Sequence, residues 1–149
     1  MSSSNLVLNT AEQKDHAGPV ISLVARPVTL ERIARSESQP SLGDQTIFTN
    51  DVYRDEEKVG FDGGVCTIVR IDDELGPIIN CNVTLSLPEG TITAQVMKDD
   101  VIPPPPFHSA ITGGTGAYQG ARGQIYIDPN SPEVHFYTVY LEPEQAAVQ

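Results

Sequence analysis

Apolar and polar residues alternate with a period of two along much of the chain, which is the pattern of half-buried β-strands. The segment Pro77–Leu87 shows this alternation most clearly. Its apolar face is formed by Ile79, Cys81, Val83, Leu85 and Leu87. The residues between them, Asn80, Asn82, Thr84 and Ser86, are polar and fall on the opposite face. The segment is therefore predicted to be a strand with one face in a core and the other in water.

Seven further segments carry a strand signal, as alternation or as runs of β-branched and aromatic residues. They are Pro19–Val28, Gln45–Tyr53, Gly63–Ile71, Gly90–Lys98, Phe107–Thr112, Arg122–Ile127 and Glu133–Leu141. Only Thr29–Glu37 has helical spacing, with Leu30, Ile33 and Ala34 in phase, and it predicts a short helix. Acidic and proline-containing turns separate the strands at roughly ten-residue intervals, which favours a β-sandwich or a closed barrel.

A glycine-rich run, AITGGTGAYQGARGQIYI, spans Ala110–Ile127 and raises the question of phosphate binding. A dinucleotide-binding fingerprint needs G-x-G-x-x-G between a strand and a helix, and a P-loop needs a lysine after its last glycine. Neither pattern is present, and the segment after the run is another predicted strand. We therefore predict that the glycines bend the chain at a tight corner, with Tyr118 packed over it.

The chain has 149 residues and a formal net charge of −11. This length predicts a single domain over residues 1–149, with a flexible N-terminus to about residue 17 and a tail from about residue 144. The negative charge argues against nucleic acid or an anionic membrane as a partner. The N-terminus lacks the basic and apolar regions of a secretory signal, and no window is apolar enough to span a bilayer. A cytoplasmic protein is therefore expected.

The residue types that carry most cofactor chemistry are scattered. His16, His108 and His135 show no metal-ligand spacing. Cys66 and Cys81 give no disulfide framework and no C-x-x-C pattern, and no Ser-His-Asp arrangement is recognisable. The expected site thus needs neither a metal nor another cofactor.

Four blocks, in this order, resemble the allene oxide cyclase and dirigent superfamily, and its cyclase branch in particular. They are SLGDQTIFTNDVY (41–53), VGFDGGVCTIV (59–69), the glycine-rich run, and EVHFYTVYLEP (133–143). The resemblance implies an eight-stranded antiparallel, calycin-type β-barrel around an apolar central cavity, assembled as a dimer or trimer. It also implies a cofactor-free enzyme that binds an apolar, unsaturated substrate and enforces the geometry of ring closure.

Two residues are candidates for catalysis. Alternation places Asn50 on one face with Thr46 and Phe48, and by resemblance this is the cavity face. Asn50 matches a family asparagine that helps to hold a water near the reacting oxygen; on sequence alone, an Asx-turn residue before Asp51 is the alternative. Cys66 matches a cavity cysteine of the family, and as a free buried thiol its alternative role is that of a small hydrophobe.

Further side chains are expected to contact the substrate. These are Pro19, Thr46, Phe48, Ile79, Lys98 and Tyr137. Pro19 matches a family proline that lines the cavity mouth, and the inward face of the strand carrying Tyr137 is left open. The reacting centre is expected beside the face of Asn50, opposite Cys66, with Pro19 near the opening.

One departure from the family changes the expected substrate. Where the plant cyclases carry a tyrosine over the substrate, this chain offers Lys98 or Met97. The resemblance therefore favours the bacterial relatives that cyclise polyketides in natural-product and antibiotic biosynthesis. The alternatives are a true allene oxide cyclase acting on an epoxy fatty acid, and a dirigent-like or carrier protein that binds a reactive apolar ligand without chemistry.

Overall fold

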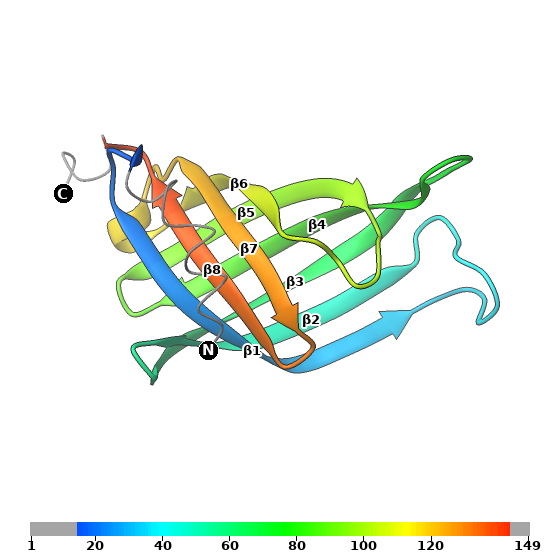
Figure 1. The fold of residues 1–149 in the computed structure, drawn as a ribbon, viewed down its shortest axis with the longest axis horizontal. Helices are drawn as coiled ribbons and strands as arrows, with labels where there is room; N and C mark the ends of the chain where they lie inside the picture. The colour runs from blue at the N-terminus through cyan, green and yellow to red at the C-terminus, as the bar shows by residue number, and fades with distance from the viewer. Residues whose placement is uncertain (1–14, 144–149) are drawn as a thin grey trace.

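The computed structural model describes residues 15–143, and strands make up most of its regular structure (Figure 1). The strands are β1 (Val20–Ile33), β2 (Gln45–Arg54), β3 (Glu57–Asp72), β4 (Gly76–Leu87), β5 (Gly90–Asp99), β6 (Phe107–Gly114), β7 (Gly123–Ser131) and β8 (Val134–Leu141). A short 3₁₀ helix, η1 (Gly116–Tyr118), joins β6 to β7. The predicted C-terminal tail, and most of the predicted flexible N-terminus, lie outside the described residues. Within those residues, no helix has the length and apolarity needed to cross a membrane.

The eight strands form one closed antiparallel barrel in sequence order. Each strand pairs with the next, and the ring closes between β8 and β1, where Leu23 lies opposite Tyr137. Closure satisfies the backbone hydrogen-bonding groups of both outer strands, which would be unpaired in an open sheet. The predicted fold class is confirmed.

The predicted helix at Thr29–Glu37 is wrong, because β1 continues in extended conformation to Ile33. Leu30 lies opposite Phe48 and Ile33 opposite Gln45, so this part of β1 remains paired with β2. A three-position helical signal in so short a segment cannot compete with a neighbouring strand that pairs the backbone directly. A register shift between Pro27 and Thr29 accompanies the extension.

The glycine-rich run turns the chain between β6 and β7, as predicted. Gly116 has a φ angle of 63°, and a Cβ atom there would lie 2.6 Å from the carbonyl oxygen of Glu89. A side chain at this position would meet both backbone strain and a steric clash. Tyr118 packs over the corner, and its hydroxyl donates to the Glu89 carboxylate at 2.8 Å. The glycines are therefore architectural.

The two ends of the barrel interior differ. One end is filled by a packed core, formed mainly by Leu23, Ala25, Val52, Leu87, Ile92, Ala94, Tyr118, Ala121, Val139 and Leu141. Towards the other end the inward side chains leave a cavity. Its rim is formed by Leu30, Asp100, Ile102 and Pro104, of which Leu30 and Ile102 are 77% and 79% exposed. The candidate site therefore lies in one half of the barrel and rests on a packed floor.

Candidate functional site

The cavity has a volume of about 340 Å³ and is mostly apolar. Alternation along the strands supplies its walls, with Phe48 from β2, Ile79 and Val83 from β4, and Ile125 and Ile127 from β7. Prolines from the β5–β6 and β7–β8 regions and from β1 complete the lining. A space of this size accommodates a small organic ligand, and its walls favour an apolar one.

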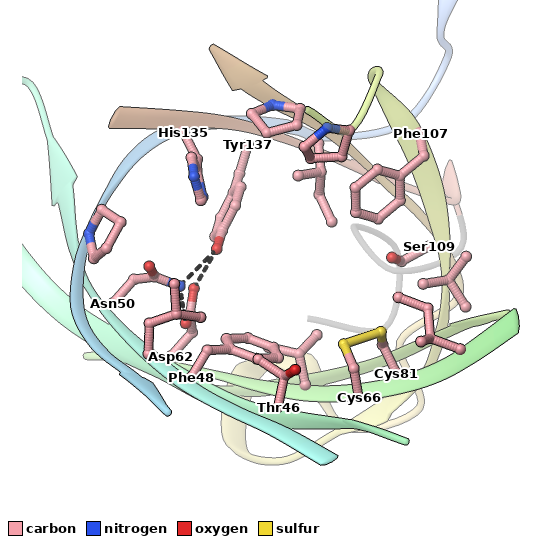
Figure 2. A pocket seen from close by; sticks show the side chains of 18 of the residues that line it. Thr46, Phe48, Asn50, Asp62, Cys66, Cys81, Phe107, Ser109, His135 and Tyr137 are labelled. Carbon is pink, nitrogen blue, oxygen red and sulfur yellow. Dashed lines mark hydrogen bonds between the residues drawn. A yellow bond between two sulfur atoms is a disulfide. The ribbon is translucent and has the colours of Figure 1, made fainter. Parts of the chain in front are cut away.

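Three polar side chains form a hydrogen-bonded cluster on one side of the cavity (Figure 2). The hydroxyl of Tyr137 donates to Asp62 Oδ2 at 2.6 Å. The side-chain amide of Asn50 donates to Asp62 Oδ1 at 2.7 Å and to the Tyr137 hydroxyl oxygen at 3.2 Å. All three residues are buried, and Asp62 is completely so. The strands β2, β3 and β8 thus bring together one carboxyl, one phenol and one amide, which we call the carboxyl cluster.

Burial dominates the electrostatics of the carboxyl cluster. It raises the pKa of Asp62, although the hydrogen bonds from Tyr137 and Asn50 act in the opposite direction. Burial, together with the negative charge of Asp62, raises the pKa of Tyr137 well above its usual range. Tyr137 therefore stays a hydrogen-bond donor, while Asp62 takes up a proton more readily than an exposed carboxyl.

Asn50 is held inside this cluster, at a position where it supports the other two side chains. Both N–H groups of its amide are used, one by Asp62 and one by Tyr137. Direct donation from Asn50 to a substrate would require one of these bonds to break. The Tyr137 hydroxyl likewise gives its one proton to Asp62, so it can donate to a ligand only when Asp62 has taken up a proton and donates in that hydrogen bond instead.

Two further polar side chains face the cavity. His135 precedes Tyr137 by two residues on the inward face of β8, and burial lowers the pKa of its imidazole against the opposing effect of Asp128. Ser109 on β6 is buried, and Figure 2 shows its hydroxyl turned into the cavity on the side away from the carboxyl cluster. Polar groups are thus present on two sides of an otherwise apolar space.

The prediction that Cys66 is a free thiol is wrong, because Cys66 and Cys81 form a disulfide. The two residues lie directly opposite each other on β3 and β4, both pointing inward, with a Cα–Cα distance of 4.0 Å. The prediction of no disulfide framework fails for the same reason. Pairing of adjacent strands placed the two sulfur atoms together, and a separation of 15 residues gave no sign of this beforehand. The disulfide lines the cavity wall as an apolar surface.

Most of the other predicted contact residues line the cavity. They are Thr46, Phe48, Asn50, Ile79, Lys98 and Tyr137. Pro19 does not: its carbonyl accepts a hydrogen bond from Leu141 at 3.0 Å, next to the packed end of the barrel. Its predicted place at the cavity mouth is therefore wrong. Cys66 lies beside Thr46 on the neighbouring strand, and not opposite the face of Asn50.

Asp62, the carboxyl group at the centre of the cluster, was not among the site residues predicted from the sequence. A usable signal was present, because Asp62, Gly64 and Cys66 share one face of an alternating strand. Once Cys66 is placed in the cavity, the same alternation places Asp62 there too. The same alternation predicts that His135 faces the cavity once Tyr137 is placed there. Nothing in the local sequence indicated that Ser109 would face the cavity.

Metal binding finds no support in the geometry. Among residues 15–143, no three histidine, cysteine, aspartate or glutamate side chains are grouped as metal ligands. The expected independence from metals and other cofactors stays a prediction.

The fold and the cavity define a class of protein: a small antiparallel barrel that encloses an apolar cavity with a buried carboxyl cluster on its wall. The chain belongs to the allene oxide cyclase barrel-like family, because the model of the allene oxide cyclase barrel like domain matches residues 22–140. The resemblance seen in the four sequence blocks is thereby confirmed.

Several solved structures share this fold. A pyocyanin demethylase is 27% identical, with a TM-score of 0.73 over 83% of this chain and 99% of that protein. The Diels-Alderase AbmU from Streptomyces koyangensis is 14% identical, with a TM-score of 0.66 over 97% of this chain and 86% of its own. A nonspecific heme-binding cyclase of neoabyssomicin biosynthesis is 17% identical, with a TM-score of 0.68 over 96% and 78%. At the last two identities, the likeness establishes the fold alone.

Proposed function

We propose that the protein is a cofactor-free cyclase of natural-product biosynthesis. It binds an apolar polyunsaturated or polyketide intermediate inside the barrel and controls its ring closure and stereochemistry. The observation that carries this proposal is the apolar cavity of about 340 Å³ with a single buried carboxyl cluster on its wall. Family membership supports the proposal, as do neighbours of the same fold that are named as cyclases and Diels-Alderases.

The apolar walls would act by restricting the ligand. A flexible polyene samples many conformers in water, and a cavity shaped by side chains such as Phe48 and Ile79 admits few of them. Holding the reacting carbons close together removes much of the entropic barrier to closure. Cycloaddition converts π bonds of the ligand into σ bonds without gain or loss of atoms, so no oxidant or second reactant is required for an intramolecular closure.

The carboxyl cluster would act by hydrogen bonding to a carbonyl oxygen of the ligand. When Asp62 carries a proton, it can donate that proton to the oxygen of Tyr137, and the Tyr137 hydroxyl is then free to donate to the ligand. Such a donor stabilises negative charge that develops on the oxygen during closure. The hydrogen bonds from Asn50 keep both partners in place, so Asn50 is a positioning residue.

A second candidate function comes from the pyocyanin demethylase, which is 27% identical and spans 99% of its own length in the match. By that analogy the cavity would accept pyocyanin or a similar compound and remove a methyl group from it. Demethylation needs a reactant that takes up the methyl carbon, whereas intramolecular closure needs the cavity to hold only one molecule. We therefore rank the cyclase first.

An achiral linear triene with a tethered enone tests the proposal, because its uncatalysed closure gives a racemic product. Chiral chromatography should show faster closure with the protein and an excess of one enantiomer. Tyr137→Phe should slow the catalysed reaction by roughly a hundredfold if the hydroxyl contacts developing charge. The control variant Tyr53→Phe alters a tyrosine whose ring packs under Arg26, outside the cavity lining, and should behave as wild type.

A triene that binds but closes at the background rate to racemic product would contradict the cyclase and favour a carrier or dirigent-like protein. Turnover of an epoxy fatty acid, but not of the triene, would favour a true allene oxide cyclase. If mass spectrometry showed that the protein removes a methyl group from pyocyanin, the demethylase function would be favoured.

A further inference from the structure

One lysine lies in the cavity lining. Of the described residues that line the cavity, Lys98 is the only lysine or arginine. Lys98 follows Ile92, Ala94 and Val96 on the inward face of β5. It precedes the rim residue Asp100 by two residues. Lys98 is half-buried, so its positive charge lies at the water-facing end of an otherwise apolar cavity.

Within residues 15–143, the ammonium group of Lys98 contacts an aromatic ring and forms no ion pair with a carboxylate. Its Nζ atom lies 4.8 Å from the ring centroid of Phe107, which also lines the cavity. Among residues 15–143, the basic groups in ion pairs are Arg32, Arg54, Lys58 and Arg70. Lys98 is absent from these pairs, although Asp100 lines the same end of the cavity. The ring keeps the charge at the cavity and leaves its N–H donors available.

We propose that the cavity takes an apolar ligand with an anionic group, a carboxylate or an ionised enol, and that this group pairs with Lys98 near the rim. The inference rests on the proposed function, because it names the class of substrate for the same cavity. The apolar part of the ligand then extends past Phe48 towards the carboxyl cluster.

The orientation of the ligand follows from the different groups at the two ends of the cavity, Lys98 near the rim and Asp62 farther inside. An anionic group that entered first would approach the carboxyl of Asp62, which is completely buried and already uses the N–H and O–H donors beside it. Desolvation of the anion opposes that arrangement whether Asp62 is charged or protonated, and an ionised Asp62 adds repulsion. With the anion at Lys98, the charge stays near water and the neutral, reacting part of the ligand reaches Tyr137. One lysine thereby selects both the ligand class and its direction of entry.

Paired probes of equal chain length, decanoate and 1-decanol, test the inference by isothermal titration calorimetry near neutral pH and at low salt. Wild-type protein should bind decanoate about tenfold more tightly than decanol, which is the scale of a charge-assisted hydrogen bond at a partly open site. Lys98→Met should remove this preference while leaving decanol affinity within about twofold. Retained decanol binding also shows that the variant cavity is intact.

Two further variants sharpen the result. Lys58→Met removes a lysine that pairs with Asp51 at 3.2 Å outside the cavity lining, and it should keep the full preference for decanoate. Asp100→Asn removes the competing negative charge at the rim and should strengthen decanoate binding by a few fold. Added salt should weaken the preference.

Equal affinities of wild-type protein for decanoate and decanol would overturn the anion site while leaving the apolar ligand cavity in place. An unchanged preference in Lys98→Met would overturn it as well. If neither probe bound to wild-type protein, both the anion site and the proposed ligand cavity would be refuted.

Discussion

The carboxyl cluster makes a quantitative prediction about stability, because three side chains share three hydrogen bonds. Tyr137→Phe removes the bond to Asp62 at 2.6 Å and the bond from Asn50 at 3.2 Å. The first involves a carboxyl and the second is an ordinary bond between side chains, so their combined loss should lower the free energy of unfolding by about 3 kcal/mol. Asn50→Ala also removes two bonds, one of them to Asp62, and should cost a similar amount.

The double variant should be less destabilised than the sum of the two single variants. Each single variant loses the bond between Asn50 and Tyr137, so the sum counts that bond twice. The difference should be about 1 kcal/mol, the typical net value of one such bond. The raised pKa of Asp62 adds to this effect, because a carboxyl that has lost both partners can limit its cost by taking up a proton.

Urea unfolding followed by far-UV circular dichroism near neutral pH measures these free energies, since the chain has no tryptophan. Tyr53→Phe is the matched control and should change stability by no more than about 0.5 kcal/mol. Additive effects of the two cluster variants, within about 0.3 kcal/mol, would refute a shared network. So would a Tyr137→Phe variant as stable as the control.

Two other predictions follow from the same wall of the barrel. Because burial raises the pKa of Asp62 above 3.8 in the folded state, its contribution to stability is complete below that pH and is lost as the pH rises through the folded pKa. Calorimetry between about pH 3 and about pH 8 should therefore show that the melting temperature of Asp62→Asn, measured relative to that of wild type, increases as the pH rises. A difference that stays constant with pH would contradict the burial effect. Replacing both Cys66 and Cys81 by alanine should lower the free energy of unfolding by about 3 kcal/mol, because their disulfide closes a loop with a sequence separation of 15. Thiol titration of denatured wild-type protein should detect cysteine only after reduction, and two thiols without reductant would contradict the disulfide.

The disulfide also bears on the cellular compartment. Structural disulfides persist in oxidising compartments and are rare in the reducing cytosol. The bond between Cys66 and Cys81 therefore counts against the cytoplasmic location expected from the N-terminal sequence. That location stays a prediction, and so does the assembly into a dimer or trimer.

The sequence by itself determined the strands and which side chains share a face of each strand. Side-chain alternation is a property of each extended segment, so Phe48 and Asn50, or Ile79 and Leu85, could be assigned to one face without knowledge of any neighbour. The glycine corner was predictable for a similar reason, since positive φ angles and close contacts are local demands. The segment Thr29–Ile33 was mispredicted because its conformation is fixed by pairing with β2, and not by its own spacing.

Only the tertiary structure decided which faces meet. In the carboxyl cluster, Tyr137 and Asp62 are 75 positions apart in the sequence. The disulfide depends on the register of β3 against β4, which places Cys66 opposite Cys81. Pro19 fell at the packed end because the core, and not the strand pattern, decides which half of the barrel stays hollow. Alternation says that a side chain points inward, but barrel closure and register decide whether it meets a ligand cavity, a packed core or a hydrogen-bond partner.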